Sequence, residues 1–208
     1  MSAVLHALPT RPELLDRPDI WRGRRRAAAV PSVATGHAAL DAVLPSNGWP
    51  AGTLSEILHA MDGVGELALV LPALAAFGDP RPIVWVAPPY VLNAPGLRQG
   101  GVSMANTRVV LTDDALAPWA AEQCLRAGCC AAVLLWTRTA NTTTLRRLQL
   151  AAEAGRCHGF VFRDERHAQN ASPAPIRLSV RRVDGQPMLR IRKCRGLLAP
   201  PAHEVAFA

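Results

Sequence analysis

Lysine is almost absent from this sequence. Of its 23 lysines and arginines, only Lys193 is a lysine, so the positive charge is nearly all arginine. This composition excludes chemistry that requires a lysine in the first two thirds of the chain. The lysine that contacts the terminal phosphates in a phosphate-binding P-loop is one such requirement.

Long apolar runs and a cysteine framework are also missing. Every apolar stretch near the length of a membrane span is interrupted by proline, glycine or charge, which excludes a transmembrane helix. The first residues, Met1 to Thr10, lack the basic start and apolar block of a signal peptide. The five cysteines follow no framework spacing, which is typical of reduced thiols. We therefore expect a cytoplasmic protein with no membrane partner.

What the chain does contain is enough apolar sequence for a core and an excess of positive charge. Its 208 residues are 50% hydrophobic, which suits one domain with short arms. The net charge is +7 and the isoelectric point is about 10.1. These values favour an acidic partner, either nucleic acid or an acidic protein surface.

Composition divides the chain into three parts. Residues 1–30 are predicted to be an arginine-rich N-terminal arm, residues 31–196 a single core domain, and residues 197–208 a loose C-terminal tail. Within the core, apolar strands alternate with segments of helical length. This alternation predicts an α/β fold whose mostly parallel sheet is covered by helices on both faces.

Two local signals refine this expectation. A helix is predicted over residues 66–77, with a kink at Pro72, because proline removes a hydrogen bond from the helix interior. The pair Asp184-Gly185 separates two strand-like segments, which predicts a C-terminal antiparallel hairpin.

A nucleotide would bind at the first strand–turn–helix unit, but the residues it needs are missing. The turn contains Gly63 and Gly65, yet Glu66 stands where a P-loop has its lysine, and a carboxylate there would repel a triphosphate. The strand that ends at Trp136 is followed by no aspartate to hold Mg²⁺. We therefore predict a degenerate P-loop, no catalytic residues, no cofactor, no metal and no enzymatic activity.

The pair Asp113-Asp114 follows another strand and has two interpretations. The carboxylates could hold a metal ion, or they could cap the helix that follows.

The cysteines Cys124, Cys129 and Cys130 lack the paired spacing of a zinc site and are predicted to be small buried residues.

Several short stretches together resemble a known family. They are Trp21-Arg22-Gly23, Gly48-Trp49-Pro50, Gly63-Val64-Gly65-Glu66-Leu67, Trp85-Val86-Ala87-Pro88-Pro89, Leu145 to Glu153, Phe160-Val161-Phe162-Arg163 and Ala171-Ser172-Pro173-Ala174. As a set, between about residues 19 and 197, they are similar to ImuA, a family of RecA/SulA-like proteins associated with error-prone translesion DNA synthesis.

The resemblance implies a RecA-like core and a function in SOS-induced DNA repair. It implies a non-catalytic accessory factor that binds an ImuB-type Y-family polymerase homologue and RecA, and indirectly serves a DnaE-type polymerase. Direct contact with DNA stays open. The alternative is a SulA-like cell division inhibitor, since SulA-like proteins share the diminished core and bind a tubulin-like division protein.

Candidate partner-binding or DNA-binding residues lie in three basic segments: the arm, one predicted helix and the terminal hairpin. They are Trp21, Arg22, Arg24, Arg25, Arg26, Arg146, Arg147, Arg181, Arg190, Arg192, Lys193 and Arg195. On the hairpin, Arg177 and Arg181 share a face, and so do Arg190 and Arg192, which predicts a continuous basic strip. The alternatives are a solvated helix face and edge-strand charges that block aggregation.

Overall fold

A computed structural model of the chain describes residues 31–77, 80–197 and 204–207. The predicted arm, with Trp21, Arg22, Arg24, Arg25 and Arg26, lies outside the described residues.

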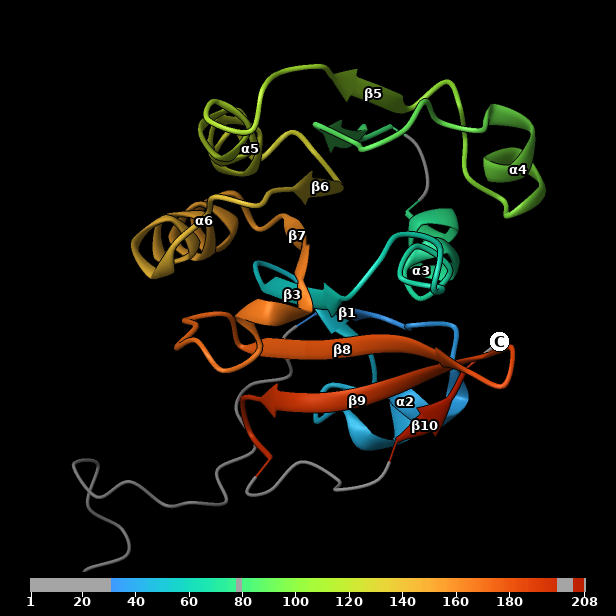
Figure 1. Cartoon of the computed structure of the whole chain (residues 1–208). Coiled ribbons are helices and arrows are strands. Elements are labelled where there is room, and N and C mark those ends of the chain that lie inside the picture. Colours follow the sequence, from blue (N-terminus) through green and yellow to red (C-terminus); the bar gives the residue numbers. More distant parts are fainter. Residues whose placement is uncertain (1–30, 78–79, 198–203, 208) are drawn as a thin grey trace, which may run out of the picture.

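The centre of the described chain is a sheet in the order β10-β9-β8-β3-β7-β6-β4-β5 (Figure 1). The strands from β8 to β5 are parallel, whereas β9 pairs antiparallel with both β8 and β10. The strand bounds are β3 Leu54–His59, β4 Ile83–Val86, β5 Thr107–Val110, β6 Ala132–Trp136, β7 His158–Asp164, β8 Ile176–Val183, β9 Gln186–Cys194 and β10 Val205–Ala206. A separate antiparallel pair joins β1 (Ser32–Val33) to β2 (Trp49–Pro50). The mixed α/β fold and the C-terminal antiparallel strands are thus confirmed.

Helices cover both faces of this sheet. They are α2 Ala38–Val43, α3 Leu71–Ala76, α4 Ala94–Gln99, α5 Ala117–Arg126 and α6 Thr142–Gly155, with a short 3₁₀ turn over Glu165–His167. Side chains alternate across a strand, so Trp85 packs in the core beneath α2, α3 and α4, while Val84 and Val86 pack in the core beneath α5 and α6. Figure 1 shows the two groups of helices on opposite sides of the strands.

The helix predicted over residues 66–77 is shorter than expected. Residues 66–70 form turns, and the helix α3 begins only at Leu71, with Pro72 in its first turn. The predicted kink is therefore wrong. Proline is well tolerated at the start of a helix, where its missing N–H would have no partner in any case.

The C-terminal hairpin is confirmed, but the tail after it is not loose where the structure describes it. Asp184 and Gly185 both adopt positive φ, as a two-residue hairpin turn requires. Beyond the hairpin, β10 pairs with β9, and Phe207 is buried and packs edge-on against the ring of His37. Burial of this aromatic side chain stabilises the packing of residues 204–207 against the domain.

Neither a membrane span nor a disulfide is found in the described parts of the chain. No helix there has both the length and the apolar character to cross a bilayer. All five cysteines are free thiols. Of the three predicted to be buried, only Cys130 is; Cys124 is half-buried and Cys129 is exposed. Cys157 and Cys194 are also buried.

Candidate partner-binding surface

The loops that follow β3, β4 and β5 leave the sheet at its carboxyl edge, where parallel strands usually place their binding sites. The ends of β4 and β5 are held side by side by pairing of Val86 with Val110 and by a hydrogen bond from the Ala87 N–H to the Val110 carbonyl. The β3 loop reaches them, because its residues from Asp62 to Ala68 line one hollow of about 500 Å³ together with Tyr90 and Arg182.

The loop after β3, which was predicted to be a degenerate P-loop, binds a carboxylate of its own. The carboxylate of Glu66 accepts hydrogen bonds from the backbone N–H groups of Gly63, at 2.9 Å, and Gly65, at 3.1 Å. The Glu66 carboxylate therefore satisfies two backbone donors of this loop and adds negative charge to it.

Gly65 is needed for packing. Its φ is +110°, and a Cβ at this position would lie 2.9 Å from Cβ of Pro187 and 3.6 Å from the ring of Phe207. The glycine thus allows the β3 loop to approach β9 and the chain end closely.

Replacement of Glu66 by alanine should destabilise the loop. The change leaves the N–H groups of Gly63 and Gly65 without their charged acceptor, so we expect a loss of about 1–3 kcal/mol in the free energy of unfolding. Urea unfolding measures this. The control is Asp62→Ala in the same loop, whose carboxylate lies 3.8 Å from His59 and should matter by less than about 0.5 kcal/mol. Equal losses in the two variants would contradict the role given to Glu66.

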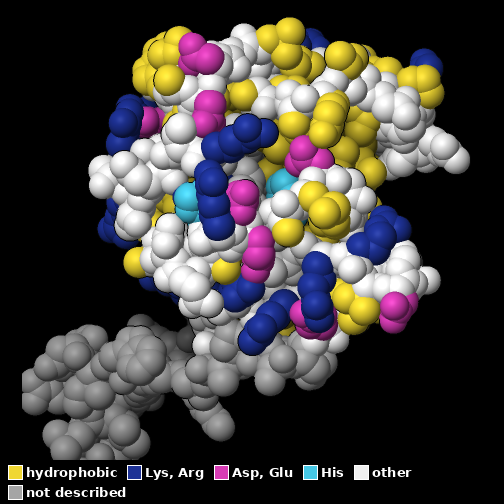
Figure 2. All heavy atoms as spheres, viewed as in Figure 1, with side chains coloured by type: hydrophobic (Ala, Val, Ile, Leu, Met, Phe, Trp, Pro, Cys, Tyr) yellow, Lys and Arg dark blue, Asp and Glu magenta, His cyan; other side chains and the backbone are white. Residues whose placement is uncertain are grey.

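The loops that follow β3, β4 and β5 carry exposed apolar side chains, one of which, Tyr90, lines the hollow. The most exposed of them are Val91, Leu111 and Tyr90, at 97%, 82% and 68% relative exposure. We call Met61, Tyr90, Val91, Leu111 and Leu116 the carboxyl-edge patch. Figure 2 shows many hydrophobic side chains over the upper part of the molecule, where β4, β5 and α5 lie, and most of the Lys and Arg side chains across its middle and lower part. Large exposed apolar patches on a folded domain usually mark a protein interface.

The aspartates beside this patch bind backbone groups. Asp113 accepts a hydrogen bond from the Leu116 N–H at 2.9 Å, and Asp114 accepts one from the Arg138 N–H at 3.0 Å. Both carboxylates thus bind turn residues, but neither caps α5 as predicted, since the N-cap residue of that helix is Leu116, with no side-chain cap hydrogen bond. Among the described residues, no group of three or more metal-ligating side chains comes together. Trp119, on the first turn of α5, is exposed and can serve as an interface anchor.

The terminal hairpin does not carry a continuous basic strip. Arg177 is buried and paired with Glu56, which removes it from the surface. Arg181 makes a bidentate pair with Glu204, and Arg192 donates to Ser179 and Glu165. A β-bulge beside Arg177 also breaks the alternation on which the prediction rested.

The remaining basic candidates among the described residues are exposed to solvent. The ammonium of Lys193 donates to the Ser172 carbonyl at 2.8 Å. Arg190 and Arg195 are exposed and make no side-chain hydrogen bond or ion pair with any described residue. On α6, Arg146 and Arg147 point outward as predicted, and Arg147 pairs with Glu122 at 2.5 Å.

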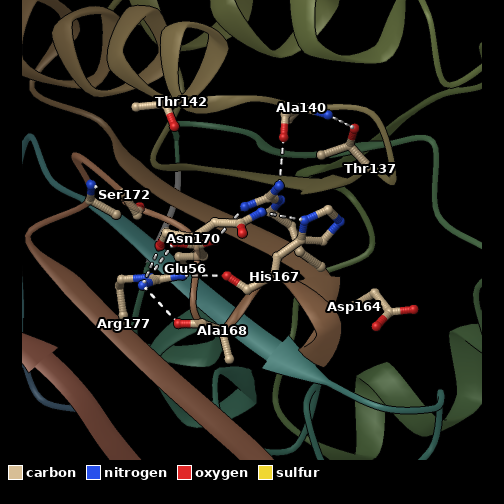
Figure 3. Close-up of polar contacts among 12 residues, drawn as sticks. Glu56, Thr137, Ala140, Thr142, Asp164, His167, Ala168, Asn170, Ser172 and Arg177 are labelled. Carbon is tan, nitrogen blue, oxygen red and sulfur yellow. Dashed lines mark hydrogen bonds and ion pairs between the residues drawn. The ribbon is translucent and has the colours of Figure 1, made fainter.

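Sequence reasoning missed a buried ionic network between the central strands. Glu56 on β3 is fully buried and contacts Arg163 of β7 at 2.6 Å and Arg177 of β8 at 2.7 Å. Arg177 also donates to the carbonyls of His167 and Asn170, at 3.0 Å each (Figure 3). The available signal was charge within strands that are otherwise apolar, since Lys, Arg and Glu are rarely buried unless paired.

Comparison with known proteins places the chain in a family. No family model matches it. The cell division inhibitor SulA of Pectobacterium atrosepticum is 32% identical over 152 residues, which are 69% of this chain and 79% of that protein. SulA of Pectobacterium carotovorum subsp. carotovorum is 32% identical over 122 residues, 55% of this chain and 70% of that protein. The crystal structure of SulA from Pseudomonas aeruginosa matches with a TM-score of 0.46 and 26% identity, covering 55% of this chain and 99% of that one. The chain belongs to the SulA family.

This finding corrects the functional prediction. The predicted resemblance to SulA-like proteins is confirmed, whereas membership of the ImuA family is not. The matching SulA proteins are named as cell division inhibitors. The prediction of an accessory factor for translesion synthesis is therefore wrong, and the alternative is favoured. The expected contacts with RecA and an ImuB-type protein stay predictions.

Proposed function

We propose that this protein is a cell division inhibitor that acts by binding a tubulin-like division protein through the carboxyl-edge patch. The observation that carries the proposal is the family: two SulA proteins named as division inhibitors match the chain at 32% identity. The patch supplies the physical means, since an inhibitor that works by occupancy needs an exposed surface that a partner can cover.

The patch has the composition of a binding surface. It combines an aromatic side chain, Tyr90, with aliphatic side chains on neighbouring loops, and the hollow beside it has Arg182 on its rim. Tyrosine and arginine are enriched among the residues that dominate binding energy at protein interfaces. The net charge of +7 favours an acidic partner surface.

The proposal includes action without nucleotide hydrolysis. The Glu66 carboxylate satisfies the loop amides that would otherwise hold a phosphate, and no lysine stands in the first two thirds of the chain. Binding in this loop would therefore place a triphosphate against a fixed negative charge.

Expression in dividing bacteria tests the function. We expect the wild-type chain to block septation and lengthen the cells. The double variant Tyr90→Ser/Val91→Ser should require about tenfold more protein for the same effect, because a pair of interface anchors commonly contributes this much or more. The matched control is Leu150→Ser, which removes an exposed leucine from α6, away from the patch. Cells of normal length with the wild type would contradict the function, and equal potency of both variants would contradict the surface.

A further inference from the structure

A second pocket opens at the N-terminus of α6, separate from the carboxyl-edge patch. Its volume is about 390 Å³, and its lining includes Asn141, Thr142, Arg163, His167 and Asn170. The pocket lies between the loop that follows β6 and the loop that follows β7. All of these side chains are polar, so the pocket suits a polar ligand.

The helix end provides one source of positive potential. α6 has 14 residues, and its Asn141 cap accepts a hydrogen bond from the Thr144 N–H at 2.9 Å. The first N–H groups of a helix have no acceptor within the helix, and the helix dipole adds a partial positive charge there. The amides of Thr142 and Thr143 are therefore placed to donate to an anion at the pocket.

The buried network provides a second and independent source. The side chains of Arg163 and Arg177 are 3% and 8% exposed, and both pair with the single carboxylate of Glu56, which is fully buried. Two buried guanidinium groups against one carboxylate leave one positive charge uncompensated. Within the described chain no other carboxylate pairs with either arginine; Asp164 pairs with Arg166, and Glu165 with Arg192. In Figure 3 the side chain of Asp164 lies apart from the network.

Arg163 also has a donor that lacks a partner. Its Nη1 donates to Glu56 and its Nη2 to the Ala140 carbonyl, but its Nε is buried and makes no hydrogen bond within the described structure. A buried N–H without an acceptor is costly, so this donor adds to the positive potential beside the pocket that no described group offsets. Burial, followed by the charges of Arg163 and Arg166, lowers the pKa of His167. The positive potential at the pocket near pH 7 therefore does not come from a protonated His167.

From these observations we infer that the pocket at the N-terminus of α6 is a binding site for a small oxyanion of the phosphate type. The anion would accept hydrogen bonds from the first amides of α6 and would compensate the excess charge of the arginine pair. The site shares no residue with the carboxyl-edge patch, so the inference does not depend on the proposed function.

The test compares two substitutions of the same kind. Asn141→Asp keeps the helix cap but places a carboxylate in the pocket. Asn93→Asp is the matched control, because Asn93 caps α4 in the same way, accepting from the Gly96 N–H, and does not line the pocket. Inorganic phosphate is titrated against each protein at pH 7 and constant ionic strength, with chloride as the reference, and followed by thermal unfolding and by the amide resonances of Thr142 and Thr143.

Phosphate should raise the unfolding temperature in a saturable way for the wild type and for Asn93→Asp, and should shift both amide resonances. In Asn141→Asp the dissociation constant should rise by at least about tenfold, because a like charge in the pocket repels the anion. A wild type that does not respond to phosphate beyond chloride, or an Asn141→Asp variant that responds equally, would overturn the inference.

Discussion

Replacement of Glu56 by glutamine should unfold this protein at a much lower temperature. The change removes the only carboxylate that pairs with the buried side chains of Arg163 and Arg177 in the described structure. Breaking a buried ion pair from one side costs about 3–5 kcal/mol, since it leaves buried charge without a partner. For a domain of this size, that loss lowers the midpoint of thermal unfolding by about 10 °C.

A second glutamate offers a matched control. Glu122 on α5 is also buried and also lies between two arginines, Arg126 and Arg147, but their side chains are 57% and 56% exposed. Because water can solvate these arginines when the carboxylate is removed, Glu122→Gln should cost no more than about 1 kcal/mol. Calorimetry measures the stability of the two variants. Similar losses of stability would show that the central network stabilises the fold no more than a surface ion pair does.

The Glu56 network also predicts a pH dependence. Burial alone would raise the pKa of Glu56, but its hydrogen bond with Ser172 and its contacts with Arg177 and Arg163 outweigh burial and lower the pKa below the ordinary 4.5. A lowered folded-state pKa stabilises the fold above the unfolded-state pKa, and this stabilisation is lost as the pH falls below it. The stability difference between wild type and Glu56→Gln should therefore be constant near neutral pH and shrink below about pH 4.5, as urea titrations at several pH values would show.

Gly155→Ala should be equally disruptive, for a steric reason. Gly155 ends α6 where that helix meets α5, and a Cβ there would lie 1.9 Å from the Leu125 carbonyl oxygen and 3.1 Å from the Gly128 nitrogen. Both contacts are with backbone, so the two helices must separate. We expect a loss of about 3 kcal/mol or more in the free energy of unfolding, at or above the usual cost of overpacking.

The control for this effect is Gly100→Ala at the end of α4. There the nearest atom to an added Cβ is the Leu97 carbonyl oxygen at 3.5 Å, an ordinary contact, and φ is negative. Its stability should stay within about 0.5 kcal/mol of the wild type. If Gly155→Ala were as stable as Gly100→Ala in urea, the close contact between α5 and α6 would not limit the fold.

The larger elements were predictable because local sequence determines them. Apolar runs of strand length identify β4 and β6, and the Asp184-Gly185 pair identifies the hairpin turn, which indeed has positive φ at both residues. The helix α4 was missed, because a six-residue helix containing Pro95 and Gly96 has no helical periodicity to detect.

The functional surfaces were harder to predict, because they depend on contacts between distant residues. Glu56 lies 107 residues from Arg163 and 121 from Arg177, and nothing local joins them. Glu66 was predicted to repel a phosphate, but its hydrogen bonds to the loop amides appear only in three dimensions. The carboxyl-edge patch was missed for a related reason: an apolar residue in a loop looks the same in sequence whether it is buried or exposed.

Inhibition of a tubulin-like division protein through the carboxyl-edge patch is tested most directly by sedimentation. That partner is assembled with GTP and pelleted in the presence of the purified chain, of Tyr90→Ser/Val91→Ser or of Leu150→Ser. We predict that the wild type and Leu150→Ser reduce the pelleted polymer in proportion to their concentration, and that the patch variant does so only at about tenfold higher concentration. Undiminished polymer in the presence of excess wild-type protein would contradict inhibition by direct binding.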